Sequence, residues 1–205
     1  MLSSVAATAH AQTLSVAEEL RVNVHVGGAM LRGDRSGQRG VGPGASMSYG
    51  NTRWFTVFAT YDEVPLHDDE YDYRLRHIDA GARSYLRGYH ATLVPFVLGG
   101  MTWRSANYGQ RLFLGDTMDV TIHGTGFTLG AGLLYYVAPR LAMEGSAKWT
   151  GGSMDRVTAD NVHFRREEST IRGATLRLNA GVSWFPGVPH PRDSRDRHRR
   201  RTGAS

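Results

Sequence analysis

Alternation of apolar and polar residues is the feature that most constrains how this chain can fold. Between Leu20 and Gly27, aliphatic residues fill every second position, and polar residues or glycine stand between them. Because successive side chains of a β-strand point to opposite faces of a sheet, this pattern predicts a strand with one apolar and one polar face. The pattern recurs and predicts eight strands, at about residues 20–27, 41–49, 54–61, 77–85, 93–103, 126–135, 141–149 and 174–185.

The connections between these strands alternate in length, after a first one of intermediate length at 31–38. The tight turns lie at residues 50–52, 87–91 and 138–140. The long segments lie at residues 62–72, 105–120 and 152–169. Short turns at one end, long loops at the other and half-apolar strands are typical of a membrane-spanning barrel. We therefore predict an all-β fold, an eight-stranded antiparallel up-and-down transmembrane β-barrel over residues 20–185, with its apolar faces outward.

Two segments test this interpretation. In the fifth strand, Val94, Phe96 and Leu98 form one face, which the barrel points outward with the other apolar faces. Residues 120–139 lack Asp, Glu, Lys and Arg and are long enough for a membrane helix. Within this segment, however, the glycines all stand at even-numbered positions, so the two faces of a strand would differ. This pattern favours a strand over a helix. The mean hydropathy of −0.37 excludes a bundle of membrane helices, and the absence of cysteine excludes disulfides, thiol catalysis and cysteine-based zinc sites.

The positive charge of the chain is concentrated at its C-terminus. The formal net charge is +5, but residues 186–205 hold most of the excess, so no basic face for nucleic acid is expected. This tail is predicted to be disordered, and it either contacts anionic lipid or is inert. Residues 1–11 end in Ala9-His10-Ala11, the small-x-small pattern of a signal peptidase site. We predict an exported protein with a signal-peptide remnant at 1–11 and a periplasmic segment at 12–19.

Three segments carry a resemblance to a known family. They are residues 78–85, the glycine-rich run 127–136 and the terminal strand 176–185, which ends in aromatic residues. Together they resemble the small eight-stranded outer-membrane β-barrel proteins, the porin-like group that contains the OmpA membrane domain and OmpX. The resemblance implies a monomer in a Gram-negative outer membrane with both termini periplasmic. It also implies contacts with outer-membrane lipids and lipopolysaccharide, and no cofactor.

The resemblance assigns a role to the last strand as well. In the family this strand is the signal read by the barrel assembly machinery, which here implies Gly181, Trp184 and Phe185. Tyrosine and tryptophan favour membrane interfaces, so two aromatic belts are expected. The belt beside the short turns holds Tyr49, Trp54, Tyr89, Tyr135 and Trp184. The belt beside the long loops holds Tyr61, Tyr73, Trp103 and Trp149. A soluble lipocalin-like carrier, with the polar face outside, remains an alternative that parity alone does not decide.

If the polar faces point inward, the lumen carries charges that must pair. The predicted network comprises Arg21, His25, Asp79, Arg83, Glu144, Lys148 and Arg177. We take Glu144 as its hub, paired with Lys148 on its own strand and Arg177 on the next, because an unpaired buried carboxylate is costly. Such a network predicts a closed lumen with a structural plug; a switchable gate, as proposed for OmpA-type barrels, is the alternative.

Other chemistry has weaker support. The segment 62–72 has six carboxylates and one histidine in a predicted surface loop, where solvated charge is expected and cation binding is the alternative. No metal site is predicted. An outer-membrane enzyme acting on lipid A, an acyl hydrolase or transferase, would need a serine and a histidine near the outer rim. The candidates are His67, His123 and His163 with Ser105 or Ser153. None lies in a recognisable motif, so the chain is predicted to be no enzyme.

Overall fold

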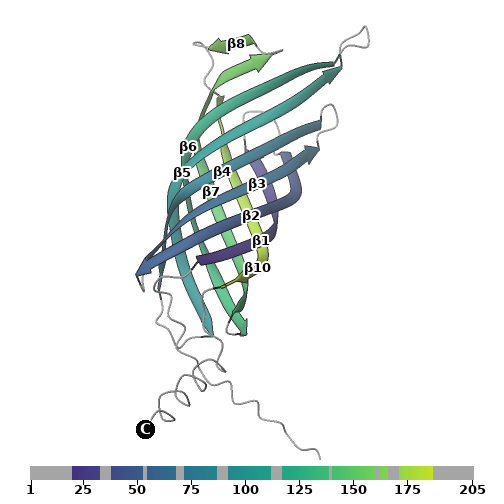
Figure 1. Ribbon diagram of the computed structural model, residues 1–205. Coiled ribbons are helices and arrows are strands. Elements are labelled where there is room, and N and C mark those ends of the chain that lie inside the picture. Colours follow the sequence, from purple (N-terminus) through teal and green to yellow (C-terminus); the bar gives the residue numbers. More distant parts are fainter. Residues whose placement is uncertain are drawn as a thin grey trace, which may run out of the picture.

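A closed barrel of eight long antiparallel strands makes up the computed structural model, which describes residues 20–32, 38–52, 55–67, 72–86, 92–111, 117–138, 140–159, 162–165 and 171–186 (Figure 1). The barrel strands are β1 Leu20–Arg32, β2 Gln38–Thr52, β3 Phe55–His67, β4 Asp72–Tyr85, β5 Leu93–Arg111, β6 Thr117–Ala138, β7 Leu141–Ala159 and β10 Ala174–Trp184. Two short strands, β8 Val162–Arg165 and β9 Ile171–Arg172, pair with β7. The predicted eight-stranded antiparallel barrel is therefore confirmed.

Strand β10 closes the barrel, because it pairs with β1 on one side and with β7 on the other. The register with β1 runs without a break from Val22 opposite Trp184 to Arg32 opposite Ala174. On its other edge, β10 pairs with β7 from Trp184 opposite Leu141 to Thr175 opposite Thr150. Closure satisfies the backbone groups on both edges of the sheet. The described residues contain no helix long and apolar enough to cross a membrane.

The strands are longer than the alternation predicts at the end of the barrel where the long loops lie. Strands β5, β6 and β7 have 19, 22 and 19 residues, and β5 and β6 extend well above the barrel in Figure 1. Residues 62–67 belong to β3 and residue 72 to β4, so the predicted loop 62–72 is wrong for most of its length. Outward positions there carry polar residues such as Ser105 and Thr125, so the alternation that predicts strands stops while the backbone pairing continues.

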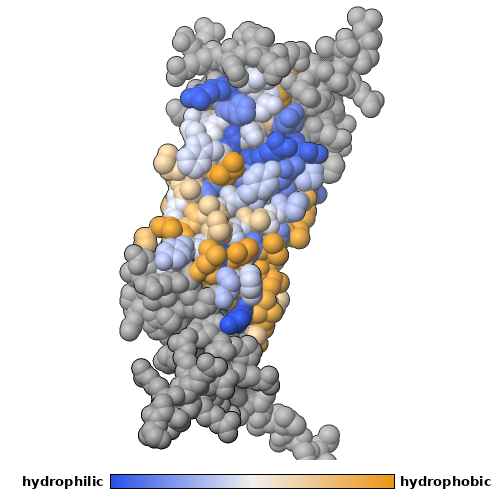
Figure 2. All heavy atoms as spheres, in the orientation of Figure 1, coloured by the Kyte–Doolittle hydropathy of each residue, from blue (hydrophilic) through white to orange (hydrophobic). Residues whose placement is uncertain are grey.

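An apolar band surrounds the barrel. Outward side chains from all eight strands contribute to it, and they include Val24, Val41, Val57, Ile78, Met101, Leu129, Met143 and Leu178. Figure 2 shows apolar side chains over the lower part of the visible face and polar ones toward the end that carries β8. The lower end, where the tight turns lie, is called the turn end here, and the other end the loop end.

Two apolar clusters lie inside the barrel, one at each end. The turn-end cluster consists of Phe58, Tyr85, Val94, Phe96, Leu98, Leu134, Ala142 and Phe185, with Tyr136 packed against it. The loop-end cluster consists of Ala29, Val64, Leu66, Leu75, Ala106 and Met154, with Leu31 and Ile122 packed against it. Buried polar and charged side chains fill the space between the two clusters.

The turn-end cluster corrects the predicted face of β5. Val94, Phe96 and Leu98 point into the barrel, and Val97 and Trp103 are exposed instead. Both parities of this segment are apolar, so its sequence does not reveal which face lies inside. The pairing of Leu93 with Tyr135 on β6 determines the face, because opposite residues of paired strands share one side of the sheet.

Inward glycines make room for large inward side chains. A Cβ atom on Gly44 would lie 2.2 Å from Nε2 of His25, and one on Gly181 would lie 2.5 Å from the His25 Cβ atom. Likewise, a Cβ atom on Gly132 would lie 2.4 Å from the ring of Phe96. Eight strands enclose only enough space for side chains, so a bulky residue on one strand requires a small one opposite.

Candidate functional site

Four charged side chains near the middle of the barrel form what we call the Asp62 cluster: Asp62, Asp79, Lys148 and Arg177. The Arg177 guanidinium donates to both carboxylates, with Nη1 2.5 Å from Asp62 Oδ2 and Nη2 2.9 Å from Asp79 Oδ2. The Lys148 Nζ atom lies 3.7 Å from Asp62 and 3.5 Å from Asp79. All four side chains are at most 4% exposed, so two cations neutralise two carboxylates out of contact with water.

Neutral groups complete the Asp62 cluster. The Arg177 Nη2 atom also donates to the hydroxyls of Thr128 at 3.2 Å and Thr150 at 2.7 Å. The His25 Nε2 atom lies 2.5 Å from Asp62 Oδ1, and its Nδ1 atom lies 2.8 Å from Asn23 Oδ1. Each carboxylate therefore meets several donors, which is what a buried charge requires to be tolerated.

Glu144, Arg21 and Arg83 form a second cluster nearer the turn end, the Glu144 cluster. Arg83 Nη2 lies 2.9 Å from Glu144 Oε1, and Arg21 Nη1 lies 3.3 Å from Oε2. The Ser183 hydroxyl donates to Oε2 at 2.8 Å. The Arg83 guanidinium also lies 4.0 Å from the ring centre of Phe96, a cation–π contact. One carboxylate thus serves two guanidinium groups here.

These contacts correct the predicted role of Glu144. It pairs with Arg21 and Arg83, whereas Lys148 and Arg177 belong to the Asp62 cluster. Lys148 is four residues from Glu144 along β7, roughly 13 Å at about 3.3 Å per residue, too far for an ion pair. Arg177 lies opposite Lys148, and the residue opposite Glu144 is Gly181.

Asp62 belongs to the charged network inside the barrel, but the predicted network does not include it. The acidic composition of residues 62–72 predicts a solvated loop, whereas Asp62 is 3% exposed and points into the barrel from β3. It shares the parity of Thr56, Phe58 and Thr60, all of which are buried. Continuing that parity by one more step could have identified it.

A small cavity separates the two clusters. Its volume is about 10 Å³, and Arg83, Glu144, Lys148, His25 and Asn179 are among the residues that line it. A space of this size is just enough for one water molecule.

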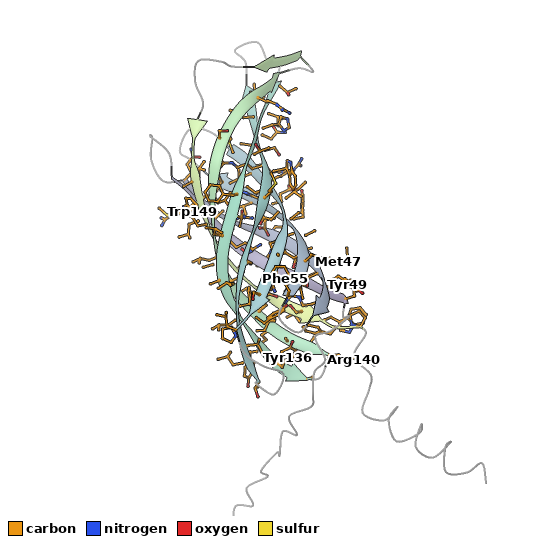
Figure 3. The ribbon with its side chains drawn as sticks, turned by 90° about the vertical axis from the view of Figure 1, so that its left-hand side faces the viewer. Met47, Tyr49, Phe55, Tyr136, Arg140 and Trp149 are labelled. Carbon is orange, nitrogen blue, oxygen red and sulfur yellow. The ribbon has the colours of Figure 1, made fainter. Side chains whose placement is uncertain are left out.

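The predicted belt residues lie on the outside of the barrel at its two ends. Tyr49, Tyr135 and Trp184 are about half exposed at the turn end. Tyr61, Trp103 and Trp149 are exposed toward the loop end, and the Trp149 ring meets Phe127 edge-on at 5.3 Å. Figure 3 shows Trp149 well above Tyr136, Tyr49 and Phe55. Trp54 and Tyr89 lie outside the described residues, and so does the side chain of Tyr73.

The predicted assembly residues occupy three different environments at the end of β10. Trp184 is 51% exposed, Phe185 is buried in the turn-end cluster, and Gly181 lies against His25. The Phe185 amide donates to the Arg140 carbonyl at 3.0 Å. The predicted segments 1–11 and 12–19 and residues 187–205 of the tail lie outside the described residues.

A charged group lies on the outer surface of β3 and β4, at the loop-end side of the belt beside the long loops. Glu63 accepts a hydrogen bond from the Tyr61 hydroxyl and ion pairs from Arg76 at 3.3 Å and Arg74 at 3.2 Å. The hydrogen bond from Tyr61, followed by the charges of Arg76 and Arg74, holds the pKa of Glu63 below its usual range. Glu63 therefore holds two guanidinium groups on the outer surface.

Of the candidate enzymatic residues, the structure describes the side chains of Ser105, His123 and Ser153. Ser105 on β5 lies opposite His123 on β6 on the outer surface, but no hydrogen bond joins them among the contacts of the described residues. Ser153 pairs with Thr125, and the side chains of His67 and His163 lie outside what the structure describes. Within the described part of the chain, no group of three His, Asp or Glu residues is placed to hold a metal ion.

Comparison with known proteins identifies the fold. No protein-family model and no curated protein matches the chain. Among solved structures, Neisserial surface protein A is similar over 80% of this chain and 96% of its own, with a TM-score of 0.64 and 14% identity. The outer membrane protein OprG from Pseudomonas aeruginosa is similar over 82% and 96%, with a TM-score of 0.55 and 9% identity.

A third similar structure is Ail, the attachment invasion locus protein of Yersinia pestis, in complex with the heparin analogue sucrose octasulfate. It is similar over 82% of this chain and 99% of its own, with a TM-score of 0.52 and 14% identity. The chain has the fold of small outer-membrane barrels. The resemblance stated from the sequence is thereby confirmed at the level of the fold.

Proposed function

We propose that this chain is an outer-membrane β-barrel protein with a structural or surface-interaction role and a lumen closed by its own charged side chains. The observation that carries this proposal is the distribution of polarity, with charged pairs inside the barrel and an apolar band outside. Along β6, apolar side chains occupy the outward positions, every second residue, from Phe127 to Val137, a span of eleven residues. A tilted strand needs about 9–11 residues to cross the hydrocarbon of a bilayer. A soluble lipocalin-like carrier would need the opposite arrangement, an apolar interior and a polar exterior.

The packing inside the barrel supports a closed lumen. Along the axis, the turn-end cluster is followed by the Glu144 cluster, the Asp62 cluster and the loop-end cluster. In this proposal, the apolar layers at both ends and the ion pairs between them close the lumen to bulk water. The ion pairs are structural in this proposal, and a switchable gate would instead require carboxylates that exchange partners.

The loop end supports a role in surface interaction. Strands β5 to β7 extend beyond the apolar band. Arg74 and Arg76 lie on the outer surface next to the belt beside the long loops. Phosphate groups of lipopolysaccharide and lipid headgroups would meet these cations. That Ail, a barrel of the same fold, binds a sulfated saccharide supports a polyanionic partner. Both ends of the barrel sequence lie at the turn end, which we place in the periplasm, with a monomer inserted by the barrel assembly machinery.

Cell fractionation, followed by gel electrophoresis of unheated and boiled samples of the protein, tests the proposed location. We expect the protein in the outer-membrane fraction, with a folded band that migrates differently from the boiled one. A soluble periplasmic protein with one mobility would overturn the proposal. Planar bilayers test the lumen, since large steady single-channel currents would contradict closure.

An enzyme acting on lipid A is the alternative that the register makes testable. Ser105 and His123 face each other on the outer surface beside the belt residue Trp103. Incubation of the purified protein with lipopolysaccharide should release no acyl chains. Release that Ser105→Ala abolishes and Ser153→Ala does not would replace our proposal with an acyl hydrolase.

A further inference from the structure

Among the residues that the structure describes, the interior of the barrel carries more positive than negative charge. The cations are Arg21, Arg83, Arg104, Lys148 and Arg177, all at most 3% exposed. The carboxylates among the described interior residues are Asp62, Asp79 and Glu144. With histidines counted as neutral, the five cations exceed the three carboxylates by two. An uncompensated charge away from water is costly, so each excess cation needs a partner.

One excess charge lies in the Glu144 cluster and has compensation there. Glu144 contacts Arg21 and Arg83, and the Arg83 guanidinium also lies against the faces of Phe96 at 4.0 Å and Phe58 at 6.0 Å. The negative face of an aromatic ring attracts a cation. This excess charge is therefore shared between a carboxylate and two rings.

The other excess charge, on Arg104, has no such compensation. Arg104 is 2% exposed, and its Nη1 atom donates to the Gly173 carbonyl at 2.8 Å. No described carboxylate forms an ion pair with it, and its Nε and Nη2 atoms are buried without a hydrogen-bond partner. These two atoms form one edge of the guanidinium, the edge that commonly receives an anion.

His77 adds a second unsatisfied group at the same level. It lies directly opposite Arg104 in the β4–β5 register, so the two inward side chains are neighbours. His77 is 0% exposed, and neither ring nitrogen has a hydrogen-bond partner. A buried ring nitrogen that carries hydrogen is a further donor available to a ligand.

We propose that the barrel binds one small anion, such as chloride, between Arg104 and His77. The anion would receive the Nε and Nη2 hydrogens of Arg104 and a ring N–H of His77, and would neutralise the second excess charge. Asp79 lies one inward position away, but Arg177 and Lys148 hold its carboxylate.

The surroundings restrict the size of the ligand. One inward position toward the loop end, Leu75 and Ala106 face each other in the loop-end cluster. One inward position toward the turn end are Asp79 and Thr102. Inward positions on a strand are separated by about 7 Å, which leaves room for a halide-sized ion rather than a large organic anion.

Urea unfolding in a zwitterionic detergent, with chloride exchanged for gluconate at constant ionic strength, tests the proposal. Above the dissociation constant, each tenfold rise in chloride should lower the unfolding equilibrium constant about tenfold. Arg104→Met should still fold, because it removes an uncompensated charge, and should lose this chloride dependence. The matched control Arg74→Met changes an exposed arginine and should retain it. An unchanged wild-type midpoint, or a chloride effect that persists in Arg104→Met, would overturn the proposal.

Crystals grown in bromide locate the ion independently. We expect one anomalous peak within hydrogen-bond distance of the Arg104 Nε and Nη2 atoms, absent in Arg104→Met. Water alone at this position, or a carboxylate of the protein itself against Arg104, would overturn the proposal. Stabilisation by sulfate but not by chloride would overturn the size that we assign to the ligand.

Discussion

The Asp62 and Glu144 clusters solve the same problem in different ways. In the Asp62 cluster, two carboxylates meet two cations, and the hydroxyls of Thr128 and Thr150 accept further hydrogen bonds. In the Glu144 cluster, one carboxylate meets two guanidinium groups, and aromatic rings contact one of these. The first cluster depends on matched charges, whereas the second depends partly on ring faces. Loss of a carboxylate should therefore cost more in the first.

Replacing Asp62 should have the largest effect. Asp62→Ala leaves Arg177 and Lys148 with one carboxylate and removes the acceptor of His25. Removing one partner of a buried pair costs about 3–5 kcal/mol, and we expect the free energy of unfolding in urea to fall by the upper part of this range. Asp62→Asn, which keeps the shape, is the matched comparison. An unchanged urea midpoint for Asp62→Ala would show that the Asp62 carboxylate is solvated and not part of a buried cluster.

Glu144→Ala should cost less, roughly 3 kcal/mol, because Phe96 and Phe58 still stabilise the Arg83 guanidinium. Adding Arg21→Met should recover part of the loss, because Arg21 contacts Glu144 directly. Adding Arg177→Met should recover nothing, since that residue pairs with Asp62 and Asp79. Recovery by Arg177→Met alone would mean that the two clusters are not separate.

Phe96→Leu tests the contribution of the ring. A leucine retains most of the apolar volume but removes the face that the Arg83 guanidinium contacts at 4.0 Å. We expect a loss of about 1–2 kcal/mol in the free energy of unfolding. Phe55→Leu changes an outward ring that is 51% exposed and is the control. Equal effects of the two substitutions would show that the Phe96 ring does not stabilise the Arg83 guanidinium.

Glu63→Ala should have the smallest effect. Its pairs with Arg74 and Arg76 lie on the outer rim, where the two arginine side chains are 60% and 43% exposed. Surface ion pairs contribute under about 1 kcal/mol, and added salt should reduce even this amount. A loss comparable to that of Asp62→Ala would show that the rim belongs to the stabilising network.

The sequence predicts which side of the barrel a residue faces better than which residue it meets. The alternation of apolar and polar residues predicts that Arg21, Arg83 and Arg177 point into the barrel, and all three side chains are buried there. It could not provide the register that puts Arg177 opposite Lys148 rather than Glu144, because register depends on pairing between distant strands.

Two predictions are wrong because of local composition: the solvated loop at Asp62 and the outward face of Val94, Phe96 and Leu98. Asp62 begins a run of acidic residues, and that run resembles a loop although its first member continues an inward face. In β5, residues 93–98 are apolar at both parities, because the inner face there packs in the turn-end cluster. Alternation identifies a face only where the two faces differ in polarity.

The proposed function requires that the apolar face of the barrel contacts lipid and that the charged face lies inside. A nitroxide scan of β1 in bilayer vesicles tests it directly, because a chain without cysteine accepts single labelled cysteines at residues 22 to 26. We expect high accessibility to oxygen, which partitions into lipid, at residues 22, 24 and 26, and low accessibility at residues 23 and 25. Uniform accessibility, or collision with a water-soluble nickel reagent at residues 22, 24 and 26, would contradict it.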